Sequence, residues 1–277
     1  MTMPAPMNAP ATALDLRYGV PGLPAGPTNT VVESILAHRS YRNFLDRKLE
    51  PGTLETLVAA ASSAPSSSNM QTWSVVAVED PERKARLSVL SGNQGFIRQA
   101  PLFLCWIADL SRLERLGEAH QQKLEGIAYL ECYMVALVDA ALAAQNALVA
   151  AESIGLGGVY VGGLRNRPLE VAAELKLPPN AFAAFGLAIG WPDPAARAEV
   201  KPRLPQSLVL HRETYDASDE QAGVTAYDET LANFSEANGM GRVGWSDRML
   251  KRVAGPESLS GRHTMTETLK AMGFGLK

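Results

Sequence analysis

A basic pentapeptide, His38-Arg39-Ser40-Tyr41-Arg42, is a compact group of hydrogen-bond donors. Its two guanidinium groups lie three positions apart, with hydroxyl groups between them and an imidazole beside them. Such a set suits a phosphate, because arginine presents a rigid, bidentate pair of donors to anionic oxygens. The same composition is also typical of a solvated helix end, where basic side chains complement the helix dipole. The pentapeptide alone leaves both interpretations open.

Other segments have the composition of a ligand site without the signature of a protein-based catalytic centre. Residues 66–71 are dense in hydroxyl and amide groups, and residues 155–163 are rich in glycine. The chain has no His-Glu-x-x-His, Gly-x-Ser-x-Gly, phosphate-loop or Cys-x-x-Cys motif. Gly155-x-Gly157 lacks the third glycine of a dinucleotide fingerprint and follows a predicted helix, which argues against a Rossmann site. A bound cofactor is therefore the expected carrier of any chemistry.

The elements that must position these segments follow from apolar spacing. Val31 to Ala37 has helical spacing, so the pentapeptide falls at the end of a helix. Residues 112–125 are charged and poorly patterned, which is typical of a surface helix or a mobile flap. Further helices are predicted at about 51–64, 82–90, 126–153 and 168–175, with two or three more in 211–277, and strands at 73–78, 102–108, 159–161 and 184–190. Strands and helices mix without strict alternation, which predicts an α+β layered fold.

The longest predicted helix is also the most apolar. From Val135 to Ala151 only Asp139, Gln145 and Asn146 are polar. A helix that is apolar nearly all round must be buried nearly all round. In a domain of this size, such a helix often lies at a subunit interface.

Composition excludes several classes of protein. The formal charge of −3 over 277 residues argues against a nucleic-acid binder. The two cysteines cannot form a disulfide scaffold or a four-cysteine metal site, and Cys105 lies in an apolar run where a buried thiol is expected. No uncharged apolar run has the length of a membrane span, and the N-terminus does not resemble a signal peptide, so we expect a cytoplasmic protein without a membrane partner.

The N-terminal residues differ from the rest of the chain. Residues 1–28 are rich in proline and alanine and show no periodicity, which predicts an extended arm, disordered or draped on a partner. No internal repeat or domain boundary is evident after this arm. We therefore predict a single domain over residues 29–277, with a mobile helical region at about 211–277.

Five segments, taken together, resemble the oxygen-insensitive NAD(P)H nitroreductases and flavin reductases, in particular the branch of the major nitroreductase and the NADPH–FMN oxidoreductases. They occur in the same order and at similar intervals as in that family. The resemblance covers residues 30 to 215 well and the C-terminal third loosely. The segments are His38–Arg42, Ser66–Ser68, Gly92–Gln94, Gly155–Asn166 and Lys201–Pro205.

The resemblance implies an α+β sandwich, with a central, mostly antiparallel sheet flanked by helices, that works as an intertwined homodimer with FMN at the interface. It further implies that NADPH, or possibly NADH, is the electron donor. The residues it assigns to FMN are His38, Arg39, Ser40, Tyr41, Arg42, Ser66, Ser67, Gln94, Phe96, Tyr160, Val161, Gly162, Gly163, Lys201 and Arg203. For Tyr160 and Val161 a core-strand role, and for Gly162 and Gly163 a turn-forming role, stay open as alternatives.

Two positions depart from the family pattern. The stretch from Phe234 to Trp245, which in relatives carries the arginines that grip the 2′-phosphate of NADPH, is shortened and offers only Arg242. Phe96 replaces a tyrosine, so one hydroxyl contact near the cofactor is lost. We therefore expect NADPH to be preferred, but by a smaller margin than in close relatives.

The resulting hypothesis is an FMN-dependent NAD(P)H oxidoreductase with ping-pong kinetics that reduces nitroaromatics, quinones or related acceptors. One alternative is a flavin reductase that supplies reduced FMN to a partner monooxygenase. Another is a flavin-binding protein without turnover. Neither nucleic acid nor a metal is expected to bind.

Overall fold

The computed structural model describes residues 12–24 and 26–277, which fall into two compact units. The first unit comprises Met1–Arg39 and Glu199–Ser258, and the second comprises Ser40–Ala198 and Leu259–Lys277. The extended arm predicted for residues 1–28 lies partly outside the described residues. The single domain predicted for residues 29–277, with its mobile C-terminal region, stays a prediction.

The second unit is built on an antiparallel sheet of four strands in the order β1-β2-β4-β3. The strands are β1 (Trp73–Val78), β2 (Leu102–Asp109), β3 (Gly157–Val161) and β4 (Ala181–Gly190). Every residue of the central strand β2 is buried, as its uninterrupted apolar sequence predicts. The predicted central antiparallel sheet is confirmed, and the predicted strands are correct to within a few residues at each end.

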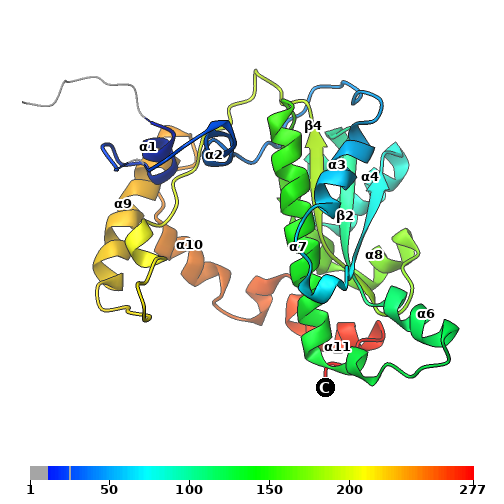
Figure 1. The fold of residues 1–277 in the computed structure, drawn as a ribbon. Coiled ribbons are helices and arrows are strands. Elements are labelled where there is room, and N and C mark those ends of the chain that lie inside the picture. The colour runs from blue at the N-terminus through cyan, green and yellow to red at the C-terminus, as the bar shows by residue number, and fades with distance from the viewer. Residues whose placement is uncertain (1–11, 25) are drawn as a thin grey trace, which may run out of the picture. The chain divides into compact units, whose positions relative to one another are not determined.

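Helices cover both faces of this sheet (Figure 1). The helices of this unit are α3 (Thr53–Ser62), α4 (Pro81–Leu90), α5 (Gly95–Gln99), α6 (Ser111–Ala119), α7 (Leu130–Ser153), α8 (Pro168–Leu175) and α11 (Met265–Ala271). Side chains alternate along β2, so Leu104 and Trp106 pack with α3 and α7. Phe103 and Cys105 point to the opposite face, in the cluster that includes residues of α4, α5 and α8. Cys105 is fully buried, which confirms the predicted buried thiol, and this burial raises its pKa.

Helix α7 is the long apolar helix that the sequence predicts, although it begins at Leu130 because residues 125–128 form a separate 3-10 turn. Small side chains let it lie close to the sheet, and its buried alanines are Ala136, Ala140, Ala143, Ala144, Ala147 and Ala151. By length and composition alone α7 would suffice to cross a membrane, with a mean hydropathy of 1.7 over an 18-residue window that is 44% buried. Its packing on the sheet accounts for the buried part of this composition, and the rest of its apolar surface is exposed. The expectation that the helix is buried nearly all round is therefore not met within one chain.

The first unit is mainly helical. It contains α1 (Ala13–Tyr18), α2 (Thr30–Leu36), α9 (Glu220–Ala237) and α10 (Trp245–Arg252). Helix α1 shows that the prediction of an extended arm is wrong for residues 13–18. A six-residue helix is too short to show periodicity, but Thr12 and Asp15 form a capping box that the sequence does contain.

The remaining regular segments are short 3-10 helices. They are Ser67–Asn69, Glu125–Ala128, Gly162–Asn166, Gln206–Leu208, Pro256–Leu259 and Arg262–Thr264. The helices predicted in residues 211–277 are present as α9, α10 and α11. Of these, α11 returns to the sheet unit, where Leu269 and Phe274 are buried beside β2 and β4 residues.

Candidate functional site

The predicted site residues are distributed over both units. His38, Arg39, Lys201, Arg203 and Arg242 belong to the first unit, and the others belong to the second. We describe each unit separately.

The basic pentapeptide directly follows the end of α2, as predicted. Helix α2 ends at Leu36, and His38 N donates to Ile35 O at 3.2 Å. The exposed side chain of Arg42 makes no hydrogen bond or ion pair with any residue that the structure describes. Its charge is therefore available to a ligand.

Tyr41 anchors the end of the pentapeptide to strand β3. Its backbone N donates to Gly158 O at 3.1 Å. Its ring covers Gly157 so closely that a Cβ atom at Gly157 would lie 2.4 Å from the ring. Gly157 is thus required by packing, and Tyr41 fixes the backbone on either side of it, including Ser40 and Arg42.

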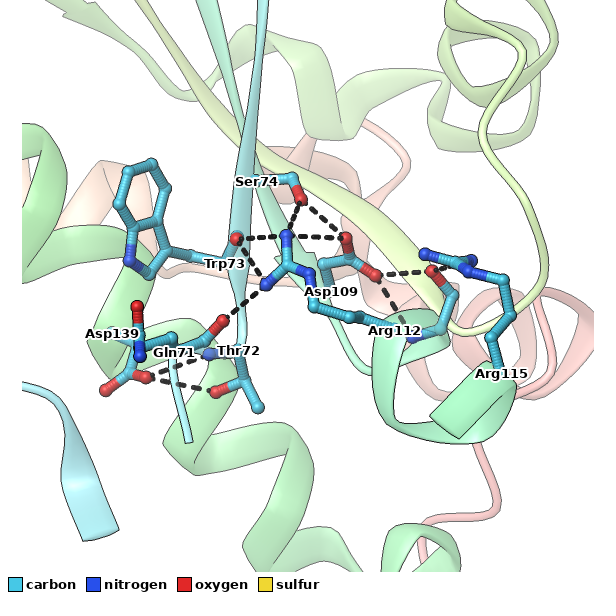
Figure 2. Close-up of polar contacts among 9 residues, drawn as sticks. Gln71, Thr72, Trp73, Ser74, Asp109, Arg112, Arg115 and Asp139 are labelled. Atoms are coloured by element: carbon cyan, nitrogen blue, oxygen red, sulfur yellow. Dashed lines mark hydrogen bonds and ion pairs between the residues drawn. The ribbon is translucent and has the colours of Figure 1, made fainter. Parts of the chain in front are cut away.

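The serine loop, residues 66–71, is bound by a carboxylate that the sequence did not single out as part of the site. Asp139 of α7, only 2% exposed, accepts a hydrogen bond from Ser66 Oγ at 2.7 Å and one from Ser67 N at 3.3 Å. It also accepts from Thr72 N and Thr72 Oγ, each at 3.1 Å (Figure 2). The signal in the sequence was that Asp139 is the one carboxylate in the apolar stretch from Val135 to Ala151.

Ser66 is already engaged within the loop. Its hydroxyl donates to Asp139 and accepts from Gln71 N at 2.8 Å. Ser68, Asn69 and Gln71 all have positive φ, which is uncommon outside glycine. The loop is therefore a preorganised turn, and Ser66 contributes to its shape whether or not it also meets a ligand.

A second buried carboxylate joins the same loop to the sheet (Figure 2). Asp109, at the end of β2, accepts from Ser74 Oγ and Ser111 Oγ, each at 2.5 Å. Burial alone would raise the pKa of Asp109, but these hydrogen bonds and the nearby Arg112 outweigh it and hold the pKa below its usual value. Arg112 in turn donates to Gln71 O at 2.6 Å, so the end of the loop is tied to β1 and β2.

Gln94 directly precedes helix α5. Hydrogen bonds fix its backbone, and its side chain can bind a ligand. Gln94 N donates to Ser88 O at 3.3 Å, and Ser88 Oγ donates to Gln94 O at 2.8 Å. The side-chain amide of Gln94 forms no hydrogen bond with the residues that the structure describes. Phe96, two positions later, packs against the core cluster on the face of the sheet that contains Phe103 and Cys105.

The segment after α7 combines one accessible side chain with buried neighbours. Tyr160 is 37% exposed, and its hydroxyl donates to Gln145 Oε1 at 3.3 Å. Burial, with a contribution from Glu152, raises the pKa of Tyr160, so the phenol stays neutral. Val161 is buried and belongs to the core cluster on one face of the sheet.

Gly163 is also explained by packing. A Cβ atom there would lie 2.3 Å from the carbonyl oxygen of Ser91. At Gly162 the nearest atom is the Arg165 guanidinium, at 3.2 Å from such a Cβ. Gly163 is therefore required by the fold itself, whereas Gly162 retains more space on its exposed side.

In the first unit, the basic loop around Arg203 contains Pro202 and Pro205, each of which fixes its own φ angle. Tyr227 of α9 donates its hydroxyl to Pro202 O at 2.9 Å. Burial raises the pKa of Tyr227, so this donor is retained at neutral pH. Arg203 Nη1 donates to Lys201 O at 3.2 Å, so the Arg203 side chain folds against the backbone of its own loop.

Arg242 is paired with carboxylates in this structure. Its guanidinium forms ion pairs with Glu229 and Glu236, both on α9, and a hydrogen bond with Asn233. An anionic ligand would have to compete with these carboxylates. The predicted contact with an NADPH phosphate stays a prediction.

The donor set fits a flavin mononucleotide better than a metal. Cationic and hydroxyl donors at residues 38–42 suit a phosphate, and the amide of Gln94 suits a polar ring edge. No cluster of metal-ligating side chains occurs among residues 12–24 and 26–277.

Comparison with known families agrees with this assignment. The model of the nitroreductase family matches residues 35–191, and that of the nitroreductase family C-terminal domain matches residues 201–277. The C-terminal third, for which the sequence resemblance was loose, is thus matched as well.

Individual relatives cover most of the chain. An FMN reductase (NADPH) of Bacillus subtilis is 41% identical over 227 residues, which span 80% of this chain and 90% of the relative. An oxygen-insensitive NADPH nitroreductase of Salmonella typhimurium is 38% identical over 224 residues, with 80% and 90% coverage. The solved structure of the NADPH:FMN oxidoreductase from Vibrio harveyi, complexed with NAD+, has a TM-score of 0.79 and 33% identity and covers 90% of this chain and all of that one.

Proposed function

The chain belongs to the nitroreductase family, and we propose that it is an FMN-dependent NAD(P)H oxidoreductase that reduces nitroaromatics, quinones or related acceptors. The family resemblance predicted from the sequence is confirmed. The observation that carries the proposal is the match of two family models, one over residues 35–191 and one over residues 201–277, which together cover the segments from which the site was predicted. The names of the relatives, FMN reductase (NADPH) and oxygen-insensitive NADPH nitroreductase, support both cofactors.

In this proposal the chain's own residues bind and orient the cofactor. FMN, when bound, supplies the hydride-transferring ring. His38, Arg39, Ser40 and Arg42 would hold its phosphate and ribityl chain, and Gln94 would hydrogen-bond its polar edge. Lys201 and Arg203 would contribute positive charge at the flavin. The exposed guanidinium of Arg42 and the amide of Gln94, which pairs with none of the described residues, are the observations that favour this assignment.

The other residues assigned to FMN contribute by shaping the site. Tyr41 fixes the pentapeptide to β3, and the structure gives Ser66 and Ser67 a defined place on Asp139. Phe96, Val161 and Gly163 are held in the core or by close packing, so we assign them to the wall of the site. Gly162 and the accessible part of Tyr160 would line it.

A flavin reductase that supplies reduced FMN to a monooxygenase is the second candidate function. It is favoured by the relatives named FMN reductase. The two candidates differ in the acceptor and share the donor half-reaction.

We further propose that the protein is a cytoplasmic homodimer. On α7 the side chains of Leu130, Met134, Val138 and Leu142 are all at least 40% exposed. They recur every fourth residue, so they form one apolar stripe along the helix. The helix was expected to be buried nearly all round, and a second copy of the chain would cover this stripe. Both cysteines are free thiols, which agrees with a reducing compartment.

The visible spectrum of the purified protein tests the proposed function most directly. We expect a yellow protein that releases about one FMN per chain on denaturation, and oxidation of NADPH on addition of an acceptor. Separate assays with nitrofurazone, a quinone and free FMN distinguish the nitroreductase from the dedicated flavin reductase. A colourless protein that does not take up added FMN would contradict the proposal. A yellow protein that does not oxidise NADPH or NADH would indicate flavin binding without turnover.

A further inference from the structure

Arg17 is a buried arginine in a part of the chain that neither family model matches. Both matches begin after it, at residues 35 and 201. Arg17 lies in the last turn of α1 and is only 8% exposed. A buried guanidinium is stable only when its donors are satisfied, so its partners define its role.

One set of partners lies at the end of α2. Arg17 Nε and Nη2 donate to Leu36 O at 3.1 and 2.7 Å, and Nη2 also donates to His38 O at 2.5 Å. Leu36 is the last residue of α2, where carbonyl groups lack helical partners. Arg17 thereby fixes the backbone at which the basic pentapeptide begins.

The second set of partners lies in the basic loop. Arg17 Nη1 donates to Lys201 O at 3.1 Å, across 184 positions of sequence. The backbone carbonyl of Arg17 accepts from Arg203 N at 3.0 Å. One residue therefore holds both segments of the first unit that the proposed function assigns to FMN.

Helix α1 is itself anchored, so it can act as a fixed support. The capping box closes its first turn, and Asp15 Oδ1 also accepts from Leu23 N at 3.2 Å. Gly19 ends the helix with φ of 69°, and a Cβ atom there would lie 2.8 Å from Thr230 Cγ2 and 3.0 Å from Pro202 Cγ. The chain thus runs in close contact with α9 and with the loop that Arg17 binds.

We propose that Arg17 is a positioning residue that fixes His38–Arg39 in the arrangement that binds the FMN phosphate and joins this segment to the Lys201–Arg203 loop. This inference rests on the proposed function. Of the side-chain hydrogen bonds described above, three go to Leu36 and His38 and one goes to Lys201, so the effect falls mainly on the phosphate-binding segment. Lysine cannot replace Arg17, because one ammonium group cannot reproduce the planar set of donors that reaches three carbonyls.

Release of flavin from the holoprotein on dilution tests the proposal in Arg17→Lys. We expect the dissociation constant for FMN to rise about 10-fold or more. After exchange into riboflavin, which lacks the phosphate, the constant should change less than about 3-fold. Arg212→Lys, an exposed arginine of the same unit, is the matched control and should leave both constants unchanged.

The outcomes separate the two proposals. A wild-type protein that binds no FMN would overturn the proposed function and this inference with it. A wild type that binds FMN, with an unchanged constant in Arg17→Lys, would overturn this inference alone. Equal losses of FMN and riboflavin would also overturn it, because they indicate a general loss of structure.

Hydrogen exchange in the wild-type protein provides a second test that needs no variant. Binding of FMN should slow exchange of the amides around His38 and also of those in α1, because Arg17 couples the two. Riboflavin should slow the α1 amides less. If FMN protects residues 38–42 and leaves α1 unchanged, the coupling is absent and the inference is wrong.

Discussion

Arg42 presents an exposed charge beside a backbone that Tyr41 holds against β3. A charge-assisted hydrogen bond to phosphate contributes about 1.5–3 kcal/mol, which corresponds to about 10- to 150-fold in affinity. We therefore expect Arg39→Ala and Arg42→Ala each to weaken FMN binding by a factor in this range. Titration calorimetry of FMN into the apoproteins measures it.

Arg47→Ala is the control for these two variants, because Arg47 is similarly exposed but pairs with Glu50 outside the pentapeptide. Its affinity for FMN should equal that of the wild type. Unchanged affinity in both Arg39→Ala and Arg42→Ala would restore the alternative interpretation of the pentapeptide as a solvated helix end.

Arg242 leads to a prediction about the choice of nicotinamide. One charge-assisted contact at an exposed position should contribute about 1–2 kcal/mol, or about 5- to 30-fold in discrimination for NADPH. Arg242→Ala should lower the ratio of kcat/KM for NADPH to that for NADH by this factor. Because Glu229 competes for the same guanidinium, Glu229→Gln should raise the ratio. A ratio that neither substitution changes would show that this loop does not contact the 2′-phosphate.

At the scale of elements, Asp139 couples α7 to the serine loop. Its Oδ2 atom accepts from Ser66 Oγ, Thr72 N and Thr72 Oγ, so Asp139→Ala leaves several buried donors without a partner. An unsatisfied buried donor costs about 1–3 kcal/mol, and we expect a total loss of about 2–4 kcal/mol in the free energy of unfolding. Urea denaturation measures this loss.

Asp139→Asn should cost less than Asp139→Ala. Its single amide oxygen can occupy the Oδ2 position and keep three of the hydrogen bonds, while the amide NH₂ faces Ser67 N. Glu131→Ala, an exposed carboxylate on the same helix, should leave stability nearly unchanged. If Asp139→Ala were as stable as this control, the loop would not depend on the carboxylate.

Elements could be predicted from the sequence where their signal is local. Helix α8 and strand β1 have the predicted bounds. Helix α8 begins at a proline, and strand β1 is rich in β-branched residues. Asp139 and Arg17 could not be assigned their roles, since their partners lie 73 and up to 184 positions away in the sequence. Periodicity predicts which face of an element is apolar, but it does not predict which distant loop a single buried charge binds.

The site shows the same division between local and distant signals. Ordered motifs led to the family resemblance, which the family match confirms, and the roles of the single segments stay predictions. Packing decided the roles of single residues within those segments, such as Gly157 beneath the Tyr41 ring and Gly163 against Ser91. Such contacts depend on close approach between segments, which composition does not reveal.

At the scale of the whole molecule, the stripe on α7 predicts self-association. Leu130, Met134, Val138 and Leu142 are between 40% and 55% exposed, and a continuous apolar stripe of this kind marks an interaction surface. Val138→Glu would place a charge in the middle of the stripe, and burial of that charge against a second chain would be costly. We expect the wild type to be a dimer at micromolar concentration and Val138→Glu to dissociate at least about 100-fold more readily in sedimentation equilibrium.

Val89→Glu is the matched control, because Val89 of α4 is 51% exposed and lies outside the stripe. This substitution should leave the dimer intact, since α4 covers the face of the sheet opposite α7. Circular dichroism of both variants should match that of the wild type, so that loss of the dimer is not confused with unfolding. A folded wild-type monomer at micromolar concentration would contradict the proposed dimer. If Val138→Glu and Val89→Glu dissociated equally, the interface would not include the stripe on α7.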